Sequence, residues 1–156
     1  MTYGQLKVSL AAVALLAFFM VGVGPAQAQT CGDPPVTADI IGGPGDDSLV
    51  GTGGADTIVG LGGDDKIDGN GGNDLICGGS GDDEIAGDGG TDEIYGDSGA
   101  DDIVGGPDAD ELVGGSGDDV MNGGAGADTF NGGSGADTCV TDGADVIGVG
   151  NPTDCP

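Results

Sequence analysis

Apolar side chains recur at every ninth position from Leu49 to Cys139, and most residues between them are glycine, aspartate or other small polar types. Each apolar residue is the centre of a short β-prone triplet, as in Thr57-Ile58-Val59, and six turn-like residues separate successive triplets. In a strand, the middle side chain points to one face and its two neighbours to the other. The pattern therefore predicts short strands with one inward side chain each, joined by tight loops.

The period is that of a nine-residue repeat, which occurs eleven times from Gly42 to Val140 without a gap or an insertion. The first position is always glycine, the eighth is always apolar, and the fourth is glycine except at Asp108. Glycine allows positive φ and close backbone approach, so we expect positions one to six to form a tight loop. The sixth position is aspartate in every repeat: Asp47, Asp56, Asp65, Asp74, Asp83, Asp92, Asp101, Asp110, Asp119, Asp128 and Asp137.

Two repeats are predicted to complete one coil of 18 residues, so that consecutive triplets fall on opposite sheets of an all-β structure. The eighth-position side chains of the two sheets would then face each other and form the core. One sheet would carry Leu49, Ile67, Ile85, Ile103, Met121 and Cys139, and the other Ile58, Ile76, Ile94, Leu112 and Phe130.

The two ends of the chain differ from the repeats. Residues 1–28 read as a secretory signal, with Lys7, an apolar run and Ala26-Gln27-Ala28 before the cleavage point. An uncleaved membrane anchor is the alternative, although the apolar run is short for a span. Residues 29–41 form a lead-in with half a repeat, in which Ile40 takes the eighth position. Residues 141–156 read as a degenerate C-terminal cap.

The charge favours cations as partners. The chain has 28 acidic residues and two lysines, and cleavage of the signal would leave Lys66 as the single basic residue. Nucleic acid is therefore not expected as a partner, nor is stable membrane insertion after signal cleavage. A disordered acidic chain is the alternative, but disorder does not require a strict nine-residue period. We expect an extracellular protein, either released or held at the cell surface.

The stacked loops provide oxygen ligands. Each sixth-position aspartate would lie over the one 18 residues later, at about 4.8 Å along the sheet. Carboxylates and loop carbonyl groups suit Ca²⁺, which takes six to eight oxygens, better than Mg²⁺. The chain has no histidine, which disfavours zinc. Gaps between stacked aspartates number five for the odd repeats and four for the even ones, so up to about nine Ca²⁺ ions are expected. No catalytic constellation is expected.

The unit Gly-Gly-x-Gly-x-Asp-x-apolar-x over residues 42–140 resembles the RTX, or hemolysin-type, calcium-binding nonapeptide. The resemblance implies a parallel β-roll with Ca²⁺ between successive loops of one edge, and it places the side-chain ligands on the eleven aspartates named above. It implies a secreted structural or surface-interaction module whose folding is driven by Ca²⁺, without catalysis of its own; the sequence identifies no protein or glycan partner. The alternatives are an ice-binding or adhesive roll and an accessory module of an extracellular enzyme system. The N-terminal signal, the four cysteines and Asp108 depart from the family pattern.

Cysteines of a secreted chain are expected to pair. Cys77 and Cys139 would lie on opposite sheets about three and a half coils apart, too far for a disulfide. Pairing Cys31 with Cys77 and Cys139 with Cys155 is favoured. Joining Cys31 to Cys139 is not excluded by chain length, and Cys139 could instead remain a buried thiol.

Overall fold

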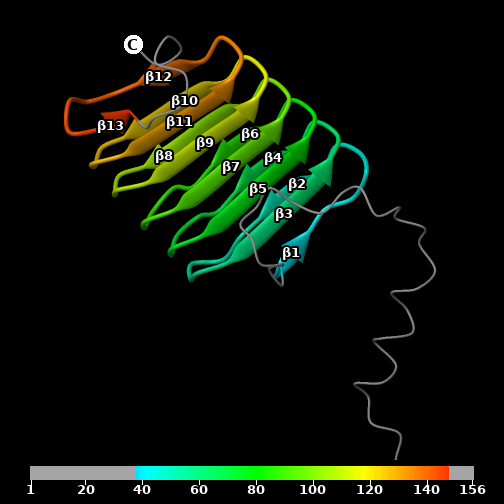
Figure 1. Cartoon of the computed structure of the whole chain (residues 1–156). Helices are drawn as coiled ribbons and strands as arrows, with labels where there is room; N and C mark the ends of the chain where they lie inside the picture. The colour runs from blue at the N-terminus through cyan, green and yellow to red at the C-terminus, as the bar shows by residue number, and fades with distance from the viewer. Residues whose placement is uncertain (1–37, 148–156) are drawn as a thin grey trace, which may run out of the picture.

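The computed structural model describes residues 38–147, and in this part of the chain all regular structure is β-strand. The strands form two parallel sheets stacked as a β-solenoid of short coils (Figure 1). Sheet A has the order β1-β3-β5-β7-β9-β11-β13, and sheet B has the order β12-β10-β8-β6-β4-β2. The strands of sheet A are β1 (Ile40–Ile41), β3 (Thr57–Gly62), β5 (Leu75–Ser80), β7 (Glu93–Ser98), β9 (Glu111–Ser116), β11 (Thr129–Ser134) and β13 (Val146–Ile147). Those of sheet B are β2 (Ser48–Val50), β4 (Lys66–Asp68), β6 (Glu84–Ala86), β8 (Asp102–Gly106), β10 (Val120–Gly124) and β12 (Thr138–Val140).

The strand register confirms the coil of 18 residues. Ile58 pairs with Ile76 in sheet A, and Ile67 pairs with Ile85 in sheet B. Strands that follow each other in the sequence therefore alternate between the sheets, because one repeat takes the chain across and the next brings it back. Loops of odd-numbered repeats lead from sheet A to sheet B along one side of the roll, which we call the odd edge. Loops of even-numbered repeats lie along the opposite side, the even edge.

The core consists of the eighth-position side chains. Nine of them, from Ile58 to Phe130, are no more than 1% exposed, and Ile40, Leu49 and Cys139 pack against them near the ends. The predicted division of these residues between two facing sheets is confirmed. Each strand gives one side chain to the core, so the core is one apolar layer from each sheet.

The strands of sheet A are longer than the predicted triplets. Strand β3 continues from position seven through position three of the next repeat, into the segment expected to be loop. Its second-position residue, Leu61, has φ of 82°, and Asp97 takes the same place in β7 with φ of 76°. This residue bends the backbone while pairing with the next coil continues, as between Leu61 and Gly79. The expectation that positions one to six form only loop is therefore wrong on the odd edge, and it is also wrong for β8 and β10 of sheet B, which extend to Gly106 and Gly124 on the even edge.

The terminal strands lie at the ends of sheet A. Ile40 of β1 pairs with Ile58, and Val146 and Ile147 of β13 pair with Thr129 and Phe130. The predicted signal segment, Cys31 and Cys155 lie outside the described residues. Between residues 38 and 147, the structure contains no helix with the length and apolar character needed to cross a membrane.

Candidate metal centre

The sixth-position aspartates are buried side chains. Nine of them are between 0% and 6% exposed, and they are Asp65, Asp74, Asp83, Asp92, Asp101, Asp110, Asp119, Asp128 and Asp137. Asp47 and Asp56, in the first coil of repeats, are only partly buried. Each aspartate directly precedes a strand, so the sheets fix its backbone, and its side chain lies inside the loop. The structure thus brings the eleven predicted residues into two rows, one on each edge.

One carboxylate oxygen of each buried aspartate is used to stack the coils. The backbone N–H of Asp119 donates to Oδ1 of Asp137 at 3.0 Å, and the N–H of Asp65 donates to Oδ1 of Asp83 at 2.8 Å. The same bond, always across 18 residues, joins every predicted pair on both edges. These nine bonds join the same nine pairs of stacked aspartates that the sequence predicts.

The other oxygen of each buried carboxylate, Oδ2, has no hydrogen-bond partner at any of the nine aspartates. It lies against the first-position glycine of its own repeat. A Cβ atom added to Gly78 would be 2.2 Å from Oδ2 of Asp83 and 2.9 Å from the carbonyl oxygen of Gly96, which lies one coil further on. A carboxylate oxygen and a carbonyl oxygen therefore approach the same point, and only glycine leaves room for them.

This contact, rather than a left-handed backbone, explains the invariant glycine of the first position. Positive φ is found at seven of the ten fourth-position glycines, as in Gly81 with φ of 126°, but not at Gly45, Gly54 or Gly126, and no first-position glycine of the eleven repeats has it. The expected role of glycine is thus divided: most fourth positions use the conformation, and the first position needs the space.

Burial changes the acidity of these carboxyl groups. Desolvation raises the pKa of Asp83 and Asp110 to about 6 and that of Asp101 to about 7, and neighbouring carboxylates add to the rise. The backbone hydrogen bond to Oδ1 acts in the opposite direction. A buried carboxylate that keeps its charge needs a positive partner, and the described part of the chain contains one basic side chain, Lys66.

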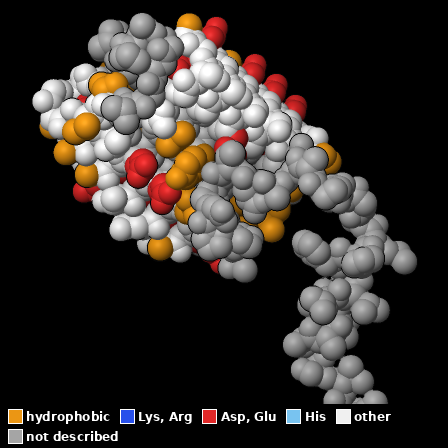
Figure 2. Space-filling view, in the orientation of Figure 1, with side chains coloured by type: hydrophobic (Ala, Val, Ile, Leu, Met, Phe, Trp, Pro, Cys, Tyr) orange, Lys and Arg blue, Asp and Glu red, His pale blue; other side chains and the backbone are white. Residues whose placement is uncertain are grey.

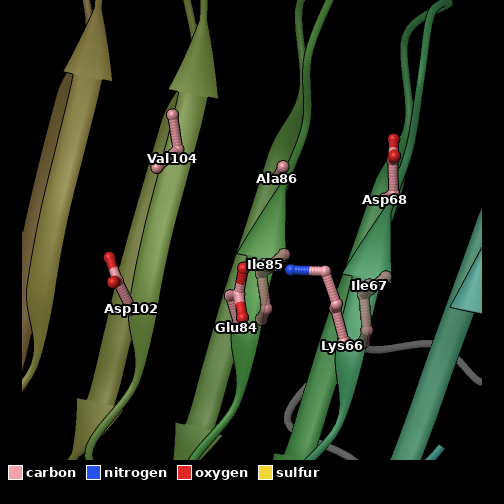
Figure 3. A pocket seen from close by; sticks show the side chains of 8 residues that line it. All are labelled: Lys66, Ile67, Asp68, Glu84, Ile85, Ala86, Asp102 and Val104. Carbon is pink, nitrogen blue, oxygen red and sulfur yellow. Dashed lines mark hydrogen bonds and ion pairs between the residues drawn. The ribbon is translucent and has the colours of Figure 1, made fainter. Parts of the chain in front are cut away.

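Lys66 does not form an ion pair with these buried carboxylates. It forms an ion pair with Glu84 on the outer face of sheet B, where both side chains are more than half exposed. Figure 3 shows this surface, a hollow between neighbouring strands, with Lys66 directed toward Glu84. The hollow is lined by Lys66, Ile67, Asp68, Glu84, Ile85, Ala86, Asp102 and Val104. Among residues 38–147, the buried carboxylates therefore have no basic side chain beside them.

The donor set suits a hard divalent cation. Each gap offers two carboxylates and nearby loop carbonyl groups, which are the ligands that Ca²⁺ prefers. Among residues 38–147, no three acidic, cysteine or histidine side chains cluster closely enough to hold a metal by themselves. A cation in a gap would therefore depend on backbone oxygens as well as on the two aspartates. The unpartnered Oδ2 atoms and the space beside the first-position glycines fit this requirement.

The first two loops differ from the others. Oδ2 of Asp47 accepts a hydrogen bond from the N–H of Gly43 at 2.6 Å. Oδ2 of Asp56 accepts bonds from the N–H of Thr52 at 2.6 Å and from its hydroxyl group at 2.9 Å. These two carboxylates begin the rows, so each would enter only the gap that follows it. Unlike the later members, their Oδ2 atoms already have hydrogen-bond partners.

Sequence reasoning missed Asp145 as a member of the even row. The N–H of Asp128 donates to Oδ1 of Asp145 at 3.1 Å, across 17 residues instead of 18. The signal was present in Gly143-Ala144-Asp145-Val146-Ile147, which has the order of positions four to eight but begins one residue early. Asp145 thus continues the row beyond the eleventh repeat.

Asp108 alters its loop without removing it. The residue does not take the left-handed conformation of the fourth-position glycine Gly81. Its Oδ2 accepts a hydrogen bond from the N–H of Gly90 at 3.2 Å, and Asp110 in the same loop keeps its place in the row. Strand β8 extends to Gly106, but β10 extends likewise to Gly124 before the regular glycine Gly126, so the longer strand is not specific to the loop of Asp108. The departure at Asp108 therefore leaves the stacking intact.

The cysteines that the structure describes occupy different environments. Cys77 lies between Val59 and Tyr95 on the outer side of sheet A and is 1% exposed, whereas Cys139 packs against the core. Neither is a free thiol. The predicted pairs Cys31–Cys77 and Cys139–Cys155 stay predictions, because Cys31 and Cys155 lie outside the described residues.

The two parallel sheets, the coil of two repeats and the rows of buried aspartate define a repeat β-roll with oxygen-lined loops. A family model described as RTX calcium-binding nonapeptide repeat (4 copies) matches residues 41–76, 78–112 and 104–139. The matches cover more than half of the chain, which therefore belongs to the RTX calcium-binding nonapeptide repeat family. A search of curated proteins finds no match to the chain.

Proposed function

We propose that the chain is a secreted calcium-binding module whose roll forms when Ca²⁺ binds between stacked loops, and which acts as a structural or surface-interaction element without catalysis of its own. The observation that carries the proposal is the set of nine buried carboxylates whose Oδ2 atoms have no partner. An unpaired buried charge is costly, and a divalent cation removes that cost at each gap. Membership of a calcium-binding repeat family supports Ca²⁺ as this cation.

The ligands are the eleven sixth-position aspartates, two to a gap, with carbonyl oxygens such as that of Gly96 completing each site. The bound ion supplies positive charge and oxygen coordination between neighbouring coils. Oδ1 of each later aspartate remains with a backbone N–H group, which leaves Oδ2 free for the ion. Five gaps on the odd edge and four on the even edge give about nine ions per chain.

Calcium binding and folding are expected to be one event. The core contains one small apolar layer per sheet, while 28 acidic residues oppose one lysine after signal cleavage. Without a cation, the rows hold like charges at the coil spacing in buried positions. Ion binding neutralises the rows and links each coil to the next, so the free energy of binding becomes free energy of folding.

The place of action is extracellular. The N-terminal segment has the pattern of a secretory signal, and cysteines that pair are typical of oxidising compartments. Calcium sites of extracellular modules commonly work at Ca²⁺ concentrations of about 0.1 to 1 mM. A chain that folds only when exported would avoid forming its roll at the low calcium concentration inside the cell.

A non-catalytic role is supported by the arrangement of the acidic groups. The buried carboxylates form a periodic row with the same contacts in each coil, whereas an acid and base pair needs two carboxyl groups in different environments. Lys66 is held in an exposed ion pair with Glu84. These features favour repeated ion ligands over a single reacting centre.

Counting bound ions tests the proposal. Native mass spectrometry and isothermal titration of the mature protein should find about nine Ca²⁺ ions per chain. Replacing Asp83 and Asp101 with asparagine should remove ions from the gaps they line. The matched control, Glu93→Gln with Glu111→Gln on the exposed face of sheet A, changes the net charge equally and should keep the count. Only one or two ions in the wild type would refute the proposal.

A further inference from the structure

The two edges of the roll differ at the fifth position of the repeat. On the odd edge this position carries four exposed aspartates, and on the even edge it carries none. The odd-edge residues are Asp46, Asp64, Asp82, Ala100, Asp118 and Ala136, and the even-edge residues are Ala55, Asn73, Thr91, Ala109 and Ala127. Acidic side chains follow one another at regular intervals along an edge of the roll in Figure 2. The nine-residue unit does not require this difference, because its fifth position is variable.

The odd-edge aspartates form an ordered second row in the first three odd-numbered repeats. The N–H of Asp64 donates to Oδ1 of Asp46 at 3.1 Å, and the N–H of Asp82 donates to Oδ1 of Asp64 at 3.0 Å. These bonds run in the opposite sense to those of the buried row, since here the later residue donates. The three carboxylates are therefore held in register, one coil apart, beside the buried row.

The buried row next to them has unsatisfied oxygens. Asp65 and Asp83 are each 2% exposed, and Oδ2 of both lacks a partner inside its loop. Their sequence neighbours Asp64 and Asp82 are the middle and last members of the second row. Two gaps, Asp47/Asp65 and Asp65/Asp83, are thus flanked by fifth-position carboxylates on both sides.

The second row places its charges beside the odd-edge gaps. Asp64 and Asp82 directly precede Asp65 and Asp83, and the backbone hydrogen bonds between coils hold both rows in the same register. On the even edge, Ala55 and Asn73 directly precede Asp56 and Asp74. The gap Asp56/Asp74 therefore also lies between two sixth-position aspartates but lacks the extra charge.

We propose that the two odd-edge gaps Asp47/Asp65 and Asp65/Asp83 are the tightest cation sites of the roll and fill first, because Asp46, Asp64 and Asp82 add negative charge beside them. This rests on the proposed function, since it ranks sites that the function requires. The second row acts through its charge, not as further direct ligands. A unit charge about 7 Å from a divalent ion strengthens binding by on the order of fivefold at the dielectric constant of water, which applies to these exposed carboxylates.

The chain contains the control that separates charge from structure. Asn73 occupies the fifth position on the even edge, and its Oδ1 accepts the N–H of Thr91 at 3.2 Å. Asparagine can therefore make the bond that Asp64 and Asp82 make. Replacing Asp46, Asp64 and Asp82 with asparagine removes three charges and keeps the acceptor atoms.

The test is a titration of the mature protein with Ca²⁺, in which binding is measured by isothermal titration calorimetry. The wild type should show a tight class of two ions, and Asp46→Asn/Asp64→Asn/Asp82→Asn should weaken that class on the order of 25-fold per site, because each gap loses two flanking charges of about fivefold each. The charge-matched control Glu93→Gln/Asp102→Asn/Glu111→Gln, on the sheet faces, should retain it. Conversely, Ala55→Asp/Asn73→Asp should add the even-edge gap Asp56/Asp74 to the tight class.

Salt and a competing site make the test decisive. The difference between wild type and the triple asparagine variant should shrink at 1 M salt, because exposed charges are screened; a purely structural role would not show this. Asp88 and Asp108 supply charge near Asp92 on the even edge. If Asp88→Asn/Asp108→Asn removes the tight class and the odd-edge variant does not, the ranking is wrong. A wild type that binds no calcium would instead refute the proposed function.

Discussion

Oδ1 of Asp101 accepts a hydrogen bond from the backbone N–H of Asp83 at 2.9 Å, although 18 residues separate the two aspartates. The bond fixes one oxygen of the carboxylate against the backbone of the preceding coil and directs the other oxygen into the loop. Because the same contact recurs along both edges, the polypeptide builds a row of identical oxygen sites from one short sequence unit. The stacking of the coils and the chemistry of the loops therefore depend on the same side chain.

The first-position glycine should not tolerate a methyl group. At Gly96 a Cβ atom would lie 2.2 Å from Oδ2 of Asp101 and 2.7 Å from the carbonyl oxygen of Gly114. We expect Gly96→Ala to lower the free energy of unfolding in calcium by about 1 to 3 kcal/mol, and to reduce the ion count, because the carboxylate must move. Chemical denaturation and ion counting check this.

Gly53→Ala is the matched control for that substitution. Gly53 has no atom within 4 Å of its added Cβ and does not have a left-handed φ. Its replacement should change the free energy of unfolding by less than about 0.5 kcal/mol. Equal destabilisation by the two substitutions would show that the contact with the carboxylate oxygen is not what requires glycine.

Acid should partly replace calcium. In the metal-free roll, burial raises the pKa of Asp83 and Asp110 to about 6 and that of Asp101 to about 7, above the ordinary value of 3.8. A raised folded-state pKa means that the folded chain binds more protons, so this contribution to stability is complete below about pH 4 and is lost as the pH rises through 6 to 7.

The metal-free protein should therefore show more β-structure by circular dichroism at pH 5 than at pH 8. With calcium present the direction reverses, since protons compete with the ion for the same carboxylates. A metal-free signal that is unchanged or weaker at pH 5 would contradict the burial of these groups. The variant Asp83→Asn/Asp101→Asn, which lacks two of these titrating groups, should show a smaller pH response.

The cysteine pairs Cys31–Cys77 and Cys139–Cys155 are expected in the secreted protein. Cys77 lies on the outer side of sheet A and Cys139 in the last strand of sheet B, which is consistent with separate links to the two ends of the chain. Peptide mapping without reductant should recover these two links. Recovery of a fragment joining Cys31 to Cys155, or of four free thiols, would overturn the assignment.

The arrangement of the coils could be predicted because the sequence period fixes it. A repeat of nine with one apolar position places Ile58 and Ile76 in neighbouring strands and Ile67 on the facing sheet. The longer strands of sheet A could not be predicted, because they depend on the left-handed backbone of residues such as Leu61, which is not a typical residue for that conformation.

The stacking of the sixth-position aspartates was predictable, but the geometry of their carboxylates was not. The invariant aspartate indicated a candidate ligand, but the sequence could not show that one oxygen binds a neighbouring N–H group while the other remains unpartnered. The contact between Gly78 and Asp83 also has no signal other than the absence of a side chain. Asp145 was missed because one deleted residue shifts it out of the nine-residue register.

Circular dichroism of the mature chain with and without Ca²⁺ tests most directly whether calcium drives the folding of the roll. At neutral pH in excess chelator, the spectrum should be that of a largely disordered chain, and addition of millimolar Ca²⁺ should produce the β-sheet spectrum, whereas equal Mg²⁺ should produce little change. A full β-sheet spectrum in chelator would show that the roll forms without the ion and would contradict the account.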